Sequence, residues 1–143
     1  MASEQDLAEQ LLRRADEDAA GARAMLPIGE VADALVCFHA QQAVEKALKA
    51  VLAARGVVFA HRHDLRVLIG QCESVDLRLP EELVDVDLLS PYAAELRYDD
   101  DVVQAVERET ASMWATAAVQ WARQQIEPKE PPKEEGSDTA QPE

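Results

Sequence analysis

The sequence predicts an all-α protein, an antiparallel up-and-down bundle of four long helices and one short helix. Ala and aliphatic residues dominate the 143-residue chain, aromatic residues make up only 4 % of it, and strong helix formers fill long stretches. In those stretches the apolar residues recur at spacings of three and four, the period of an amphipathic helix. Gly and Pro lie mainly between the stretches, where the chain must turn.

The first helix is expected from about Glu4 to Leu26. Ser3 and Asp6 resemble a capping box, with Asp in place of the usual Glu. The segment Pro27-Ile28-Gly29 breaks the helix. The apolar residues that recur at helical spacings of four or three in this segment are Leu7, Leu11, Ala15, Ala19 and Ala22.

The second helix, from about Glu30 to Arg55, organises the chain, and Gly56 should end it as a C′ glycine. One face is apolar and is formed by Val36, Ala40, Ala43, Ala47 and Val51. A single polar stripe occupies the remaining arc and consists of His39, Gln42, Lys46 and Lys49, with Glu45 at its edge. A helix of this kind belongs at the centre of a bundle, with its stripe either facing water in a groove or pairing across an interface.

A short third helix should begin at His63-Asp64, with Asp64 or His63 near the N-cap, and end around Ser74. Pro80 is suited to the first position of a fourth helix. Ser90-Pro91 lies inside that segment and should kink or interrupt it, because Pro has no N–H to donate.

The last helix is expected over roughly Val102 to Ile126, with Asp99-Asp100-Asp101 providing its N-cap. Beyond it, five Pro or Gly residues among charges predict a disordered acidic tail. The expected domain organisation is therefore a helical bundle over residues 1–126 and a disordered tail over 127–143.

The charge balance argues against a broad nucleic-acid-binding surface. The net charge is −14, and −10 remains on residues 1–126 when the tail, with its six acids and two bases, is left out. Nucleic acid could then bind only at a local basic stripe. Cys37 and Cys72 are expected to be buried thiols of an intracellular protein. Without a signal peptide or an apolar run long enough for a membrane span, a cytoplasmic protein with no membrane contact is expected.

Most enzyme signatures are absent, including a phosphate-binding Gly-rich loop and a nucleophile elbow. The densest polar cluster is His61-Arg62-His63-Asp64, which could bind a metal ion or simply form a helix start capped by Asp64. No partner with helical ligand spacing is evident, so we expect no metal and no cofactor. The polar stripe likewise has two interpretations, a binding pocket or interface and a solvated helix face with a Glu45–Lys49 pair.

Arg97 and Tyr98 form a second candidate site before the last helix. Arg97 could bind a phosphate in a bidentate manner, and Tyr98 could stack on a base or form a hydrogen bond. The alternative is that Arg97 pairs with Glu95 or with the three aspartates that follow.

Three segments, in this order, resemble the HEPN domain family over roughly Leu7 to Ile126. Phe38 to Ala50 is similar to the long second helix of that family, and His63-Asp64-Leu65 followed by Leu68 resembles its short His-Asp-Leu segment. Arg97-Tyr98 occupies the place of an Arg-Tyr-Pro turn before the last helix.

The resemblance implies a helical bundle that forms a homodimer and acts with a minimal nucleotidyltransferase, often as a toxin–antitoxin pair. A nucleotide or RNA would then be the ligand. The residues predicted to bind it are His39, Gln42, Glu45, Lys46, His63, Asp64, Arg97 and Tyr98.

Several branches of the resembled family are metal-independent ribonucleases that use an Arg and a His separated by four to six residues. No His follows Arg97 at that spacing, and the pair Arg55 and His61 lies at the end of the second helix instead. A non-catalytic or weakly catalytic binding module is therefore the preferred hypothesis. The alternatives are a ribonuclease toxin that uses Arg97 as its catalytic residue with His39 or His63, and a scaffold dimer without a ligand.

Overall fold

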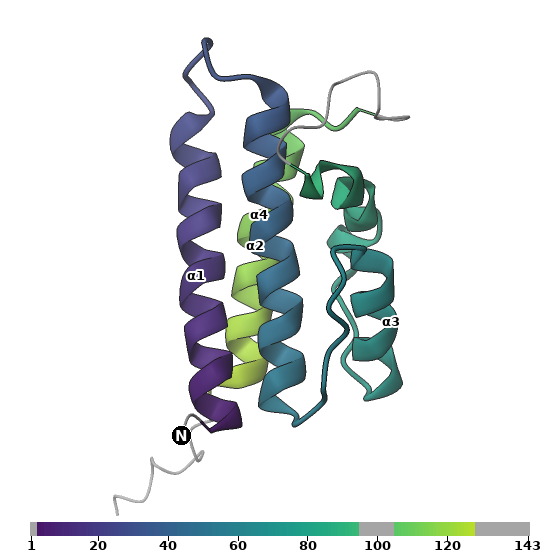
Figure 1. Ribbon diagram of the computed structural model, residues 1–143. Coiled ribbons are helices and arrows are strands. Elements are labelled where there is room, and N and C mark those ends of the chain that lie inside the picture. Colours follow the sequence, from purple (N-terminus) through teal and green to yellow (C-terminus); the bar gives the residue numbers. More distant parts are fainter. Residues whose placement is uncertain (1–2, 95–104, 128–143) are drawn as a thin grey trace, which may run out of the picture.

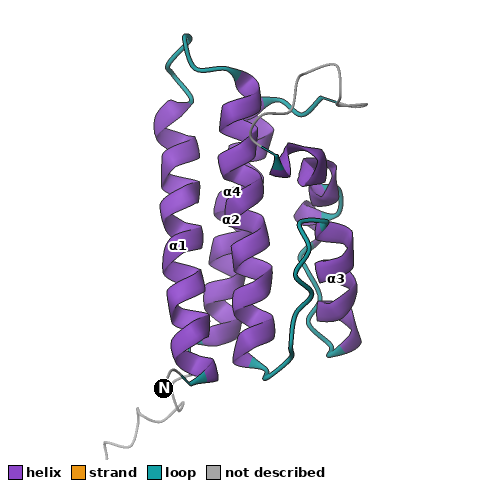
Figure 2. Cartoon of the chain, in the orientation of Figure 1, coloured by secondary structure: helices purple, strands orange, loops and turns teal. Residues whose placement is uncertain are grey.

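The computed structural model describes residues 3–94 and 105–127, and every regular element in these ranges is helical (Figure 2). Three long helices, α1 (Glu4–Met25), α2 (Asp33–Ala54) and α4 (Arg108–Ile126), form the bundle. The short helix α3 (Leu65–Ser74) and two 3-10 segments, η1 (Glu81–Leu83) and η2 (Val86–Ala93), pack on one side of it (Figure 1). The predicted all-α class is confirmed.

The arrangement of the long helices differs in two ways from the predicted up-and-down bundle, in which four long helices would alternate in direction. First, the helix expected from Pro80 is present only as η1 and η2, and Pro91, which cannot donate a helical hydrogen bond, lies inside η2. Second, α1 runs antiparallel to both neighbours, whereas α2 and α4 run in the same direction (Figure 1). Arg108, at the start of α4, accordingly contacts Asp33 at the start of α2, with 2.6 Å between Nε and Oδ1.

Helix α2 lies at the centre and packs against α1, α3, η2 and α4. It supplies much of the core, and several of its largest side chains, such as Leu48 and Leu52, are fully buried. The buried face of α1 is formed mainly by Ala, which lets the two backbones approach closely. Its buried residues are Ala8, Leu12, Ala15, Ala19 and Ala22. Of the apolar residues with helical spacing, the three Ala residues are therefore buried, whereas Leu7 is exposed and Leu11 is only half-buried.

The residues predicted to cap the first two helices form the expected hydrogen bonds and backbone conformations. The hydroxyl of Ser3 accepts a hydrogen bond from the backbone N–H of Asp6 at 3.0 Å, and the Asp6 carboxylate accepts one from the N–H of Ser3 at 3.2 Å. Gly56 has a φ of 72°, and the Val57 N–H bonds to the Leu52 carbonyl at 2.9 Å, which is the Schellman arrangement. A Cβ at Gly56 would also lie 3.1 Å from a carboxylate oxygen of Glu4.

Helix α4 begins later than predicted, at Arg108 rather than near Val102, since residues 105–107 are described and not helical. Just before α4, both the N–H and the carbonyl of Val106 form hydrogen bonds to side chains. Its N–H donates to Tyr92 Oη at 3.1 Å, and its carbonyl accepts from Cys37 Sγ at 3.3 Å. The proposed caps Asp99 to Asp101 and the tail from residue 128 lie outside the described residues.

Cys37 and Cys72 are both buried, as predicted. Burial, with a smaller contribution from the Glu73 charge, raises the pKa of the Cys72 thiol to about 12, so this thiol stays protonated at neutral pH. In the described part of the chain, no helix is both long and apolar enough to cross a bilayer.

Candidate functional site

The stripe predicted on α2 divides into two clusters, the first of which faces α1. Asp18 of α1 accepts from two side chains of α2: Lys46 Nζ lies 2.6 Å from Oδ2, and His39 Nδ1 lies 3.1 Å from Oδ1. Solvent reaches 35 % of the His39 side chain and 27 % of the Lys46 side chain. We call Asp18, His39 and Lys46 the Asp18 cluster; it places two nitrogen donors beside one carboxylate at a partly open surface.

The second cluster surrounds the buried carboxylate of Glu45 and faces the start of α3. Lys49 Nζ lies 2.8 Å from Oε2, Gln41 Nε2 donates to Oε1 at 3.0 Å, and His63 Nδ1 lies 3.0 Å from Oε1. Gln41 also donates to the backbone carbonyl of His63 at 3.1 Å, which fixes the chain just before α3. We call Gln41, Glu45, Lys49 and His63 the Glu45 cluster.

The Glu45 carboxylate is ionised at neutral pH in spite of its burial. Burial by itself would raise its pKa, but the hydrogen bonds from Lys49, Gln41 and His63 outweigh that effect, so the pKa of Glu45 lies below its ordinary value. The charge of Lys49 acts in the same direction. This cluster is therefore a satisfied buried ion pair with a histidine at its edge.

The other predicted site residues have smaller or different roles. Gln42 donates to the side-chain oxygen of Gln41 at 2.7 Å and so touches the Glu45 cluster from outside. Asp64 is the N-cap of α3 and accepts from the Arg66 N–H at 3.0 Å, as the structural interpretation predicted. Arg97 and Tyr98 lie outside the described residues.

Sequence reasoning missed Asp18 and Gln41 as site residues. Asp18 lies on the polar side of α1 beside the buried Ala15 and Ala19, and only the pairing of α1 with α2 brings it to the stripe. Gln41 offered a signal that could have been used, because Gln41, Glu45 and Lys49 are spaced four residues apart and therefore share one helix face.

The structure does not bring the side chains of His61, His63 and Asp64 together as ligands of a metal ion. No group of three or more His, Cys, Asp or Glu side chains is placed to hold a metal ion within residues 3–94 and 105–127. His61 instead lies edge-on to Phe59, with 6.1 Å between the ring centroids.

The comparisons with known proteins agree with this architecture. The sequence matches the HEPN domain over residues 8–124. The crystal structure of TT1696 from Thermus thermophilus is similar, with a TM-score of 0.55 and 31 % identity over 83 % of this chain and 92 % of that one. No curated protein matches the chain significantly. Because the match spans most of the sequence, this chain belongs to the HEPN domain family, a class of nucleotide-binding and ribonuclease-type modules.

Proposed function

We propose that this protein is a nucleotide-binding module that acts as a homodimer with a nucleotidyltransferase partner, in the manner of a toxin–antitoxin pair. Membership of the HEPN family supports the dimer and the partner. Co-purification with a nucleotidyltransferase encoded beside this gene would separate this function from that of a scaffold dimer without a ligand.

The Asp18 cluster carries the nucleotide-binding part of the proposal. Lys46 and His39 already converge on two oxygens of one carboxylate, at 2.6 and 3.1 Å, and a phosphate offers oxygens of the same kind. Both side chains are partly exposed, so a phosphate can reach them from solvent. Asp18 competes with such a ligand, which gives the site a modest affinity in a protein of net charge −14.

A titration of the purified protein with ATP, followed by calorimetry, tests this site. Lys46→Ala should weaken ATP binding about tenfold, because a charge-assisted hydrogen bond to phosphate is lost. Asp18→Asn should strengthen it, because the competing carboxylate is neutralised. Arg66→Ala removes a cation that is paired with Asp87 and lies outside the cluster, and it should leave the affinity unchanged.

Flat titrations for the wild type and Lys46→Ala alike would refute nucleotide binding. Equal losses in Lys46→Ala and Arg66→Ala would show that ATP responds only to overall charge and not to the Asp18 cluster.

A metal-independent ribonuclease is the second candidate, and the pair of His63 and Glu45 favours it. The His63 side chain is 70 % exposed while its Nδ1 is held by the buried carboxylate, so Nε2 remains available to act as a base on a 2′-hydroxyl. Arg97 is the residue proposed to bind the phosphate.

Incubation with a mixed RNA substrate in EDTA tests this second function. If the protein is a ribonuclease of this kind, cleavage occurs in the wild type and is lost in His63→Ala and in Arg97→Ala. His61→Ala is the matched control, because that exposed histidine makes no ion pair with any residue in the described ranges. Intact RNA after incubation with the wild type would eliminate the ribonuclease.

A further inference from the structure

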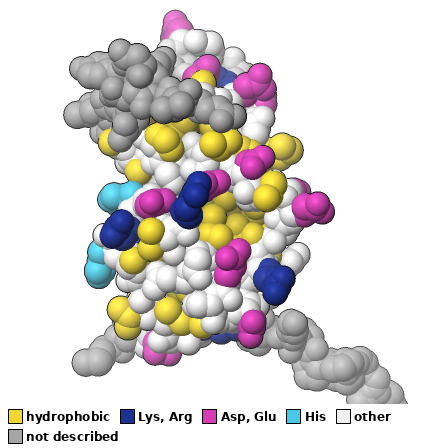
Figure 3. Space-filling view, turned by 90° about the vertical axis from the view of Figure 1, so that its right-hand side faces the viewer, with side chains coloured by type: hydrophobic (Ala, Val, Ile, Leu, Met, Phe, Trp, Pro, Cys, Tyr) yellow, Lys and Arg dark blue, Asp and Glu magenta, His cyan; other side chains and the backbone are white. Residues whose placement is uncertain are grey.

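A hollow of about 480 Å³ lies on the face of the molecule opposite α1, between α3 and the chain that leads into η1. Five aliphatic or Pro residues form its floor: Ile69, Leu79, Pro80, Leu83 and Val84. We call it the α3–η1 groove. In the space-filling view it is an open apolar depression with charged side chains around it (Figure 3). Val84 is 72 % exposed, and among the large hydrophobic residues of the described ranges only Val58 is more exposed.

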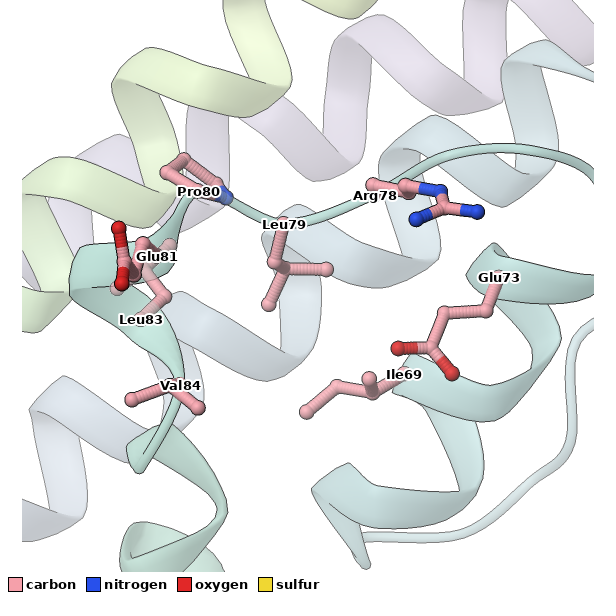
Figure 4. Close-up of a pocket in the computed structure, with 8 residues that line it drawn as sticks. All are labelled: Ile69, Glu73, Arg78, Leu79, Pro80, Glu81, Leu83 and Val84. Atoms are coloured by element: carbon pink, nitrogen blue, oxygen red, sulfur yellow. The ribbon is translucent and has the colours of Figure 1, made fainter.

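The rim of the α3–η1 groove carries two acidic side chains and one basic side chain. Glu73 and Arg78 lie at one side of the hollow and Glu81 lies at the other, with Ile69, Leu79 and Val84 between them (Figure 4). The segment from residue 69 to 85 contains one basic residue and five exposed acids, of which Glu73 and Glu81 line the hollow itself; the others are Asp76, Glu82 and Asp85.

Ion pairs between described residues do not neutralise these carboxylates. Within residues 3–94 and 105–127, the ion pairs involve other acids, such as Asp87 with Arg66, and none of the five takes part. An apolar floor between unpaired carboxylates is complementary to an apolar face flanked by cations.

We propose that the α3–η1 groove binds a basic amphipathic helical segment of a partner protein. Aliphatic side chains of the partner pack on Leu79, Leu83 and Val84, and its Lys or Arg residues pair with the carboxylates of the rim. This surface is separate from the Asp18 cluster, so the inference does not depend on nucleotide binding.

Two other occupants fit less well. Two copies of this chain that met groove to groove would bring Glu73 and Glu81 of each copy together, and like-charge repulsion opposes that arrangement. The C-terminal segment, residues 128–143, holds five acids and two bases and has no Leu, Ile, Val, Met or aromatic residue to place on the floor.

Binding of a short fluorescent helical peptide, with Leu on one face and Lys on the other, tests the proposal by anisotropy with the full-length protein. Val84→Gln should weaken binding about tenfold, and the double variant Glu73→Gln with Glu81→Gln should weaken it and reduce its salt dependence. The same peptide with Glu in place of Lys should not bind.

Two variants control for general surface effects. Met113→Gln alters another large exposed apolar side chain, 60 % exposed on α4, and Glu17→Gln with Glu30→Gln removes two exposed acids away from the groove. Both should bind the Lys peptide as the wild type does, and circular dichroism confirms that each variant is folded.

The proposal is overturned if the Lys peptide does not bind, or if Val84→Gln and Met113→Gln reduce binding equally. It is also overturned if sedimentation shows that the wild type self-associates and Val84→Gln abolishes this association, because a second copy then occupies the groove.

Discussion

Replacing Glu45 with Ala should lower the free energy of unfolding by about 3 kcal/mol, because it removes one partner of a buried ion pair and leaves the other without compensation. Lys49 is largely buried, and its only ion-pair partner in the described ranges is Glu45. Gln41, which is fully buried, loses an acceptor at the same time. Urea unfolding followed by circular dichroism measures the change.

Two further variants separate the charge of Glu45 from its packing. Glu45→Gln keeps the shape and one acceptor oxygen, so it should cost less than Glu45→Ala. Adding Lys49→Met to Glu45→Gln removes the uncompensated cation and should recover part of the loss. A loss below about 1 kcal/mol in Glu45→Ala would mean that Lys49 reaches solvent readily and that the pair contributes little.

The same carboxylate makes a predictable contribution to the pH dependence of stability. Its folded-state pKa lies below the ordinary value of 4.5, so the folded protein holds the ionised form more strongly than the unfolded chain does. The stabilisation is complete above that value and is lost as the pH falls through the lower folded-state pKa. Glu45→Gln should remove this part of the acid-induced loss of stability.

Arg108→Ala should also be strongly destabilising, by about 2–4 kcal/mol, because one guanidinium holds the turn between α1 and α2. It donates to the carbonyl oxygens of Met25 at 3.1 Å and of Leu26 and Ile28 at 3.3 Å, and it also donates to that of Val31. Hydrogen exchange over residues 25–33 should speed up more than exchange at the centre of α2.

Conservative variants identify which feature of Arg108 matters. Arg108→Lys keeps the charge but cannot reach several carbonyls at once, so most of the loss should remain. Asp33→Asn weakens only the exposed ion pair at the edge of this arrangement and should cost less than about 1 kcal/mol. Equal effects of Arg108→Ala and Asp33→Asn would show that the carbonyl contacts contribute nothing.

Features of the fold that depend on nearby residues could be predicted from the sequence. The capping box at Ser3, the C′ role of Gly56 and the N-cap at Asp64 each depend on chemistry within a few residues. The helix expected from Pro80 could not be predicted correctly, because the apolar spacing there is compatible with both an α-helix and the tighter 3-10 turns that the structure contains.

The candidate site was only partly predictable, because its partners are distant in the sequence. Helical spacing placed His39, Lys46 and Glu45 on one arc of α2. It could not show that α1 covers one edge of this arc while the chain before α3 covers the other. Asp18 therefore meets Lys46 across 28 positions of sequence, and His63 meets Glu45 across 18.

The contact between Tyr92 and the backbone of Val106 has a consequence for how this protein can vary. The hydrogen bond links a residue before the segment that carries Arg97 and Tyr98 to a residue after it, so the chain is fixed to the bundle on both sides of that segment. Lengthening a connection whose ends are already fixed lowers the free energy of unfolding only slightly, by about 0.6 kcal/mol for each doubling of the number of residues in it. The number of residues between Tyr92 and Val106 can therefore change in designed variants at little cost to the stability of the described helices.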